Sequence, residues 1–349
     1  MRDVVESSRE PDNARLAWSS WLIKSWFLLG IVGVFIAAVC APGVAATGGP
    51  LHLGRWQDGL FLLMFFATGV ALRTSELGAA LSHWRLHALC QGFNLGLTPL
   101  LAAAADPLLG LAGVPAAWRL GILVTLCLPM TISSCVLLTR LAGGSEAAAL
   151  TQATLGGLLG IVLTPLWLLL LAGGQAEIHA GTAIGHLALV VVLPVLAGQL
   201  LQRCWPTLIR ARPWLNQLAT IALLVNLHQV FCASFTDRSM LSWNLAWLAL
   251  AMGALHLLLF ASAWHLAGWR GWRLSHGERI AAAICSSHKT AALGIPLIGV
   301  LFHGNPHLGL IVLPLVTYHM AENLLDGGLA AWFRNVDRKA DGNAGSRPA

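Results

Sequence analysis

A lysine lies near the middle of an apolar stretch that is long enough to cross a bilayer. The stretch covers residues 281–302, and the lysine is Lys289. An ammonium group at the centre of a membrane costs about 3 kcal/mol on insertion scales. Such a charge is tolerated when it faces a partner or a water-filled cavity, so Lys289 marks a candidate functional site. Ser286, Ser287 and the Gly-Ile-Pro sequence at 294–296 can interrupt this helix, which is typical of substrate or ion sites in transporters.

A second apolar stretch, residues 117–140, carries similar interruptions. Pro129 removes a backbone hydrogen bond and frees a carbonyl, and Thr131, Ser133 and Ser134 supply hydroxyls close to it. These oxygens are the ligands that a small cation or a polar substrate needs. Membranes tolerate irregular backbone only against protein or a cavity. We therefore expect Ser134 and Ser287 to face one central polar cavity. The alternative is that these small residues only pack helices together.

Further polar residues fall inside apolar stretches and complete the candidate substrate or ion site. We expect Glu322 to be the partner of Lys289, because paired charges insert more cheaply than separate ones, and His288 or His319 can join them. The alternative for Glu322 is that it lies near the cytoplasmic end of the last span and extends its carboxylate into water. For Asp326, we expect this position near the cytoplasmic end. The other candidates are Gln91, Asn94, Cys135, Gln152, His288 and Thr290.

The composition predicts a membrane protein that crosses the bilayer many times. Of the 349 residues, 57% are hydrophobic and only 10% are charged, whereas soluble domains carry about 25% charged residues. Hydropathy predicts about ten spans, each near the ~20 residues that a bilayer requires. They cover residues 18–40, 57–73, 86–105, 117–140, 146–172, 182–203, 213–235, 243–267, 279–302 and 307–333.

The basic residues predict the orientation of these spans. If both termini are cytoplasmic, 17 of the 21 Lys and Arg lie inside, Lys289 lies in the membrane, and only Arg55, Arg119 and Arg238 lie outside. So strong a bias is typical of a multi-pass protein of the cell inner or plasma membrane with both ends inside. It also explains the net charge of +6 without nucleic acid as a partner.

Ten spans divide into two halves of five, which are inverted relative to each other because five is odd. Two short matches support this division: residues 132–135 (ISSC) resemble 285–288 (CSSH), and 160–166 (GIVLTPL) resemble 309–315 (GLIVLPL). The predicted fold is an all-α polytopic membrane protein. Its predicted parts are a cytoplasmic N-terminal tail 1–17, five-helix repeats 18–172 and 182–333, and a cytoplasmic C-terminal tail 334–349.

No sequence signature of an enzyme is present. The chain lacks GxSxG, HExxH and the P-loop, and its predicted loops are too short to hold a catalytic or nucleotide-binding domain. Its seven cysteines contain no CxxC and lie mostly in apolar stretches, so we interpret them as small apolar fillers. We therefore expect neither an enzyme nor an organic cofactor.

Three blocks of the sequence, residues 65–91, 128–166 and 285–325, resemble the bile acid:sodium symporter superfamily. They are most similar to its orphan, SBF-like branch, and the block containing GGSEAAA is the most specific part. The resemblance implies ten helices in two inverted repeats. It implies a panel domain made of spans 1, 2, 6 and 7, and a core domain made of the others. Spans 4 and 9 would be broken and would cross at mid-membrane, where sodium-coupled members bind two Na⁺.

This sequence departs from the sodium-coupled pattern at the implied ion sites. Those members have a Ser-Asn pair in span 4, and a glutamate followed by a Gln-Asn pair in span 9. Here the positions read Ser134-Cys135, Cys285 and His288-Lys289-Thr290. An ammonium and a Na⁺ about 4 Å apart repel by about 4 kcal/mol at an effective dielectric of 20. The resemblance still implies Ser134, Gln152 and Ser287 as candidate Na⁺ ligands.

These observations predict a secondary active transporter that works by alternating access on an organic anion. Lys289 would offer the anion a positive charge, and the N-termini of half-helices would add positive dipole ends. Lys289 would stand in for the missing Na⁺, and H⁺ becomes the coupling ion if Lys289 releases its proton during the cycle. The alternative is a non-transporting membrane sensor or regulator of ion homeostasis. The expected partners are a small-molecule substrate and membrane lipid, with the chain as a monomer or weak homodimer.

Overall fold

The computed structural model describes residues 26–45, 53–72, 83–172, 185, 188–235, 244–302, 304–305 and 307–344. Throughout this part of the chain, the regular structure is helical. The predicted tail 1–17 and the start of the first span, residues 18–25, lie outside the described residues.

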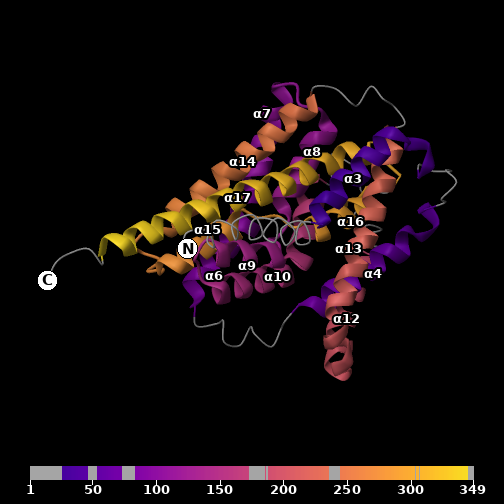
Figure 1. Cartoon of the computed structure of the whole chain (residues 1–349). Coiled ribbons are helices and arrows are strands. Elements are labelled where there is room, and N and C mark those ends of the chain that lie inside the picture. Colours follow the sequence, from indigo (N-terminus) through magenta and orange to yellow (C-terminus); the bar gives the residue numbers. More distant parts are fainter. Residues whose placement is uncertain are drawn as a thin grey trace, which may run out of the picture.

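Within the described residues, the first half of the chain contains seven α-helices, two of them joined by a π-helical segment (Figure 1). They are α3 (Trp26–Cys40), α4 (Gln57–Ala71), α6 (Trp84–Gln91), the π-helical η5 (Gly92–Leu97), α7 (Thr98–Leu111), α8 (Ala116–Cys127), α9 (Ile132–Leu141) and α10 (Glu146–Ala172). Short 3₁₀ turns, η1 (Pro42–Val44) and η2 (Leu53–Trp56), lie between α3 and α4.

The second half repeats this helical character. It contains the π-helical η6 (Ala188–Val192), then α12 (Leu193–Cys204), α13 (Pro206–Phe235), α14 (Asn244–Ala267), α15 (His276–Ser287), α16 (Ala291–Leu301) and α17 (Leu308–Ala344).

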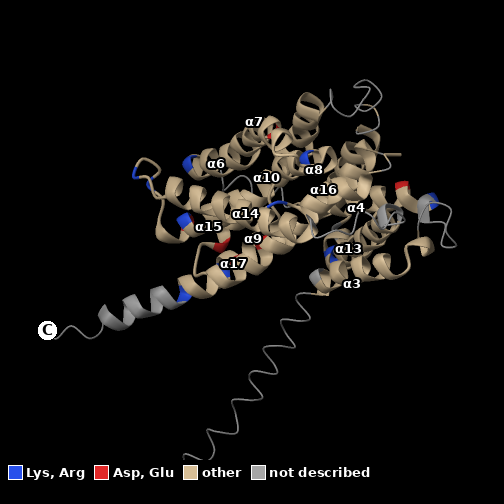
Figure 2. Cartoon of the chain, turned by 90° about the horizontal axis from the view of Figure 1, so that it is seen from above, with Lys and Arg blue, Asp and Glu red and all other residues tan. Residues whose placement is uncertain are grey.

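Length and composition identify the membrane segments among the described residues. Six helical stretches qualify as spans, and a seventh is the pair α8 and α9, which is bent by 68° at its break. Shorter apolar helices cover Leu29–Cys40, Gln57–Ala71 and Ala188–Cys204. Charged residues are sparse on the ribbons in Figure 2. The chain is therefore an all-helical, multi-pass membrane protein.

Three helix boundaries differ clearly from the predicted spans. The third span continues to Leu111, the end of α7, instead of ending at residue 105. α13 begins at Pro206 instead of residue 213, because proline fits the first turn of a helix and Pro213 is accommodated inside it. α17 continues through the predicted tail as far as Ala344 instead of ending at residue 333. The residues after 333 include arginine, lysine and alanine, which favour helix.

The described helices pack in two groups. α4 packs against α12 and α13, and α3 also packs against α13. Gly69 and Gly198 allow α4 and α12 to approach closely, since a Cβ on Gly198 would lie 2.5 Å from the carbonyl oxygen of Phe66. In the other group, α17 packs against α8 and α14, and α10 packs against α9 and α15. Figure 1 shows α14 running beside the long α17.

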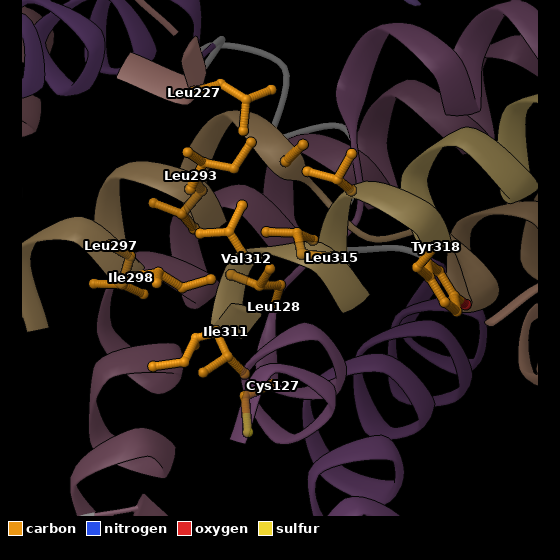
Figure 3. Close-up of a cluster of buried hydrophobic side chains, with 14 of the residues drawn as sticks. Cys127, Leu128, Leu227, Leu293, Leu297, Ile298, Ile311, Val312, Leu315 and Tyr318 are labelled. Carbon is orange, nitrogen blue, oxygen red and sulfur yellow. The ribbon is translucent and has the colours of Figure 1, made fainter. Parts of the chain in front are cut away.

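A core of buried aliphatic side chains joins the two groups. Figure 3 shows Leu227 of α13 near Leu293 of α16, with Val312 and Leu315 of α17 beside them. Leu128, from the break between α8 and α9, is fully buried in the same cluster. The break between α8 and α9 therefore contributes to this core.

Candidate functional site

Two interrupted helices meet in the interior. α8 ends at Cys127 and α9 begins at Ile132, because Pro129 lacks an N–H and forces Leu128 into an extended conformation. α15 ends at Ser287 and α16 begins at Ala291. The N–H of Thr290 in the second break donates to the carbonyl of Pro129 in the first, at 2.8 Å.

The serine pairs lie beside these breaks and not in them. Ser133 and Ser134 form part of the first turn of α9, whereas Ser286 and Ser287 form the last turn of α15. The residues that occupy equivalent positions in the two breaks are Thr131 and Thr290, which are the N-caps of α9 and α16. The two serine pairs therefore occupy opposite sides of their breaks.

Lys289 binds the carbonyl end of α8. Its ammonium donates to the carbonyls of Leu126 at 3.1 Å and Leu128 at 3.0 Å. It also donates to the carbonyl of Asn94 at 3.1 Å and to the hydroxyl of Thr98 at 2.8 Å. The last carbonyls of a helix have no partner within the helix and form the negative end of its dipole. The ammonium, which is fully buried, supplies the missing donors.

Asn94 and Tyr318 bind the carbonyl end of α15 in the same way. The Asn94 amide donates to the carbonyls of Cys285, Ser286 and His288 at 3.0–3.3 Å. The Tyr318 hydroxyl donates to the carbonyl of Ser287 at 2.6 Å. Asn94 belongs to the π-helical segment η5, a conformation that often occurs at functional sites. The C-termini of α8 and α15 at the two breaks are thus capped by buried side chains.

The two helix N-termini at the breaks are not capped by side chains. Neither Thr131 nor Thr290 accepts a capping hydrogen bond from its own helix. Both residues line a cavity of about 610 Å³ together with Ser133, which is exposed. The first turns of α9 and α16 therefore present the positive ends of their dipoles to this cavity.

The cavity lies between the breaks and the group formed by α4 and α13. α4 contributes residues that include Thr68, and α13 contributes Arg212, Asn216 and Thr220. Arg212 donates through Nε to the carbonyl of Val70 at 2.8 Å and through Nη2 to the Gln202 amide oxygen. Its guanidinium is therefore held at the cavity wall. Lys289 is not among the residues that line this cavity.

The sequence suggested that Glu322 is the direct partner of the Lys289 ammonium. The structure gives the Glu322 carboxylate other partners. Its carboxylate accepts the backbone N–H of Lys289 at 2.9 Å and contacts His319 Nδ1 at 2.7 Å. Carbonyls and a hydroxyl hold the ammonium instead. His288 and His319 do join this network, as predicted, since His288 Nδ1 lies 3.5 Å from Glu322 Oε1.

We expected the Asp326 carboxylate to reach water, but the structure buries it. It is 1% exposed and lies between two histidines, 2.8 Å from His288 Nε2 and 2.7 Å from His256 Nε2. Burial is possible because both carboxylate oxygens have donors and because α14 and α17 pack together.

The remaining predicted residues lie in other surroundings. Gln91 donates to the side-chain oxygen of Gln152 at 3.1 Å, and the Gln152 amide nitrogen lies 2.8 Å from His87 Nδ1. Gln152 lines a second, smaller cavity of about 230 Å³. Cys135 is fully buried in an apolar cluster, and Ser134 is half-buried outside the large cavity.

Two of the three candidate Na⁺ ligands, Gln152 and Ser287, have different partners. Gln152 contacts Gln91 and His87, whereas the Ser287 hydroxyl donates to carbonyls of its own helix, Ala283 at 2.9 Å and Ile284 at 3.2 Å. No described contact brings the side chains of Ser134, Gln152 and Ser287 together at one point.

Several residues of the site were not predicted from the sequence. Arg212 was assigned to a cytoplasmic loop because the span was started one residue after it. Thr98 binds the ammonium through a common hydroxyl that gives no distinct signal. His256 did leave a signal, since it is a histidine near the centre of the apolar span 243–267.

Comparison with known proteins identifies the family. The model of the SBF-like CPA transporter family matches residues 25–335. The sodium/bile acid cotransporter 7 of Danio rerio is 33% identical over 306 residues, 86% of this chain and 91% of that protein. The protein of the same name in Rattus norvegicus is 33% identical over 320 residues, 89% of this chain and 93% of that protein. An uncharacterized protein of Pseudomonas aeruginosa is 31% identical over 313 residues, 87% of this chain and 91% of that protein. The chain therefore belongs to the SBF-like CPA transporter family, a family of transporters and not of enzymes.

Proposed function

We propose that this protein is a secondary active transporter that moves an organic anion by alternating access. In the part of the chain that the structure describes, seven candidate spans and three shorter apolar helices make ten apolar segments, which suits two inverted repeats of five. The group of α3, α4, α12 and α13 would be the panel. The remaining helices, with the two breaks, would be the core.

One observation carries this proposal: the cavity of about 610 Å³ lies between the two packing groups and touches both breaks. Small-molecule sites in proteins usually have volumes of about 300–1,000 Å³ and favour interfaces between domains. A site bounded by two bodies changes its access when one body moves against the other, which is the basis of alternating access.

The charges around the cavity favour an anion. The uncapped N-termini of α9 and α16 carry partial positive charge, and Arg212 adds a full one. Much of the remaining wall is apolar, with residues such as Met64, Leu150 and Ile161. The substrate would therefore have an anionic group and an apolar body. Arg212, and not Lys289, would be its cationic contact.

The predicted topology places the cavity on the cytoplasmic side. The lining residues of α13 begin with Arg212, near the start of the helix, and those of α4 run to Leu72, just after its end. Both helix ends are cytoplasmic in the orientation that the basic residues predict. This conformation would be the one that exchanges substrate with the cytoplasm.

Coupling would not use the sodium sites of related transporters. The name of the relatives, sodium/bile acid cotransporter 7, raises Na⁺ as a candidate. In this chain, the Lys289 ammonium already holds three carbonyls and a hydroxyl beside the breaks. We propose that this ammonium occupies the place of a bound cation, so transport proceeds without Na⁺.

A thermal-shift screen of the purified full chain against organic anions, with Na⁺ or choline as the counter-ion, tests this function. A ligand that binds the folded state raises its stability, so we expect a shift that is equal in Na⁺ and in choline. Proteoliposome uptake of the radiolabelled hit then tests transport. Ser133→Leu fills the cavity and should abolish both signals, whereas the neighbouring Ser134→Leu should retain them.

Strict dependence on Na⁺ would contradict the coupling proposal. Saturable binding without any flux would favour the sensor or regulator instead.

A further inference from the structure

A cluster of buried ionisable side chains lies directly behind the cavity, and the proposed anion site does not use it. The ring of His288 lies between two carboxylates. Its Nε2 is 2.8 Å from Asp326 Oδ2, and its Nδ1 is 3.5 Å from Glu322 Oε1. None of the three side chains is more than 1% exposed. We call these three residues the proton cluster.

The geometry of the proton cluster provides for one exchangeable proton. A neutral imidazole has one N–H and one lone pair, so it can donate to only one of two flanking carboxylates. The doubly protonated ring donates to Asp326 through Nε2 and directs its second N–H toward Glu322 and Thr131. Its positive charge also compensates carboxylates that are removed from water, where an unpaired charge is costly. Gain or loss of one proton therefore changes how the break after α15 is held to α17.

Other ionisable groups surround the proton cluster and set its charge. His256 Nε2 contacts the second oxygen of Asp326 at 2.7 Å, and His319 Nδ1 contacts Glu322 at 2.7 Å. The groups that face the cluster or its neighbour Lys289 are Tyr318 and His319 of α17, His256 of α14, Cys285 of α15, Cys135 of α9, Cys127 of α8 and Lys289 in the break.

Thr131 connects the proton cluster to the cavity. Its hydroxyl lies 3.4 Å from His288 Nδ1, and the same residue lines the cavity. A hydroxyl can donate and accept hydrogen bonds at once. It can therefore give its proton to His288 while taking another from a water molecule in the cavity, and the reverse transfer releases the proton. No net change occurs at Thr131.

We infer that His288, Asp326 and Glu322 form a proton-binding site that exchanges with the cavity through Thr131. The proton is then the ion that binds next to the anion. Binding of the two is reciprocal, because each charge lowers the cost of the other by the same factor. This inference rests on the proposed function for the role of the cavity, but the site itself can be tested without any transported anion.

The experiment follows proton binding by infrared spectroscopy of the full chain in lipid nanodiscs, with isotope-labelled histidine rings. The titration covers about pH 5 to pH 10 and so extends beyond the range of about pH 5 to pH 8 in which unperturbed histidines change charge. We expect one reversible imidazole transition that is absent in His288→Gln. The control is His228→Gln, which removes another membrane histidine whose ring nitrogen contacts the carbonyl of Val34. That variant should keep the transition.

A pH jump tests the route. Thr131→Val should reach the same end point as the parent, but roughly tenfold more slowly, the factor that a barrier increase of about 1.4 kcal/mol produces. Thr317→Val is the control, since that hydroxyl bonds to carbonyls of its own helix, and its rate should match the parent.

Identical titrations of the parent and His288→Gln would overturn the site. If His288→Gln does not fold, Asp326→Asn replaces it, and an unchanged transition there has the same meaning. An unchanged rate in Thr131→Val would overturn the route. Because no anion is present, a failed transport assay would leave these results standing, and a failed titration would leave anion transport standing.

Discussion

At the residue scale, the unusual feature of this protein is a lysine that serves as a helix cap. Lys289, Glu322, His288 and His319 could be located from the sequence, because charged and ionisable residues inside apolar stretches are rare, whereas Asp326 was expected in water and His256 was missed. It assigned Lys289 the wrong direct partner, since carbonyls leave no trace in a sequence. Every residue has one, and only the three-dimensional path of α8 determines which carbonyls lack donors.

The cap can be tested by replacing Lys289 with a smaller side chain. Lys289→Ala leaves the carbonyls of Asn94, Leu126 and Leu128 without the ammonium, and each buried acceptor that loses its donor costs about 1–3 kcal/mol. We expect a lower melting temperature in choline and partial recovery in Na⁺, because the vacated space is lined by the oxygen ligands that hard cations prefer. Adding Thr98→Val removes one of these ligands and should weaken the recovery.

Equal melting of Lys289→Ala in Na⁺ and in choline would contradict the idea that the lysine replaces a cation.

At the element scale, hydropathy and proline positions predicted most of the helices well. The predicted span 146–172 coincides with α10, and span 243–267 begins one residue before α14. The positions of the breaks were less accurate. The serine pairs suggested them, but the interruption at Pro129 and the extended residues 288–290 lie a few residues away. Serine is compatible with a helix terminus on either side, so it does not define where the helix stops.

Close packing of α4 on α12 gives a prediction at this scale. In Gly198→Ala the new methyl group would lie 2.5 Å from the carbonyl oxygen of Phe66 and 2.9 Å from the amide nitrogen of Val70. Backbone cannot move aside like a flexible side chain, so the helices must separate, at a cost of about 1–3 kcal/mol. Gly59→Ala on α4 meets nothing within 4 Å and should be neutral or slightly stabilising. Thermal unfolding in detergent compares the two variants, and equal melting temperatures would disprove the packing argument.

At the scale of the whole molecule, the cavity between the two packing groups was not predictable from the sequence alone. Its wall comes from α4, α9, α10, α13 and α16, and the sequence separation of these helices hides their proximity. The expected polar site at the breaks was nevertheless close to it, because Thr131, Ser133 and Thr290 line the cavity. Arg212 was missed because it stands where a loop was expected.

Access to this cavity can be measured with a membrane-impermeant thiol reagent. Ser133→Cys, in a background in which the exposed Cys40 and Cys204 are replaced by serine, should be modified from the cytoplasmic face. An organic anion that binds in the cavity should slow the reaction. Ser134→Cys serves as the matched control and should react more slowly, since its side chain lies outside the cavity. Modification of Ser133→Cys only from the opposite face would contradict the proposed orientation.

The Lys289 ammonium also bears on the energy source of transport. A cation that is part of the chain returns to its starting side in every cycle, so it draws no work from an ion gradient. Moving a monovalent anion into a cell against an interior-negative voltage costs about 2.3 kcal/mol per 100 mV. One accompanying proton cancels that cost, and the cycle becomes electrically silent. Accumulation of the anion would then depend on the difference in pH across the membrane. It would depend neither on the sodium gradient nor on the membrane voltage.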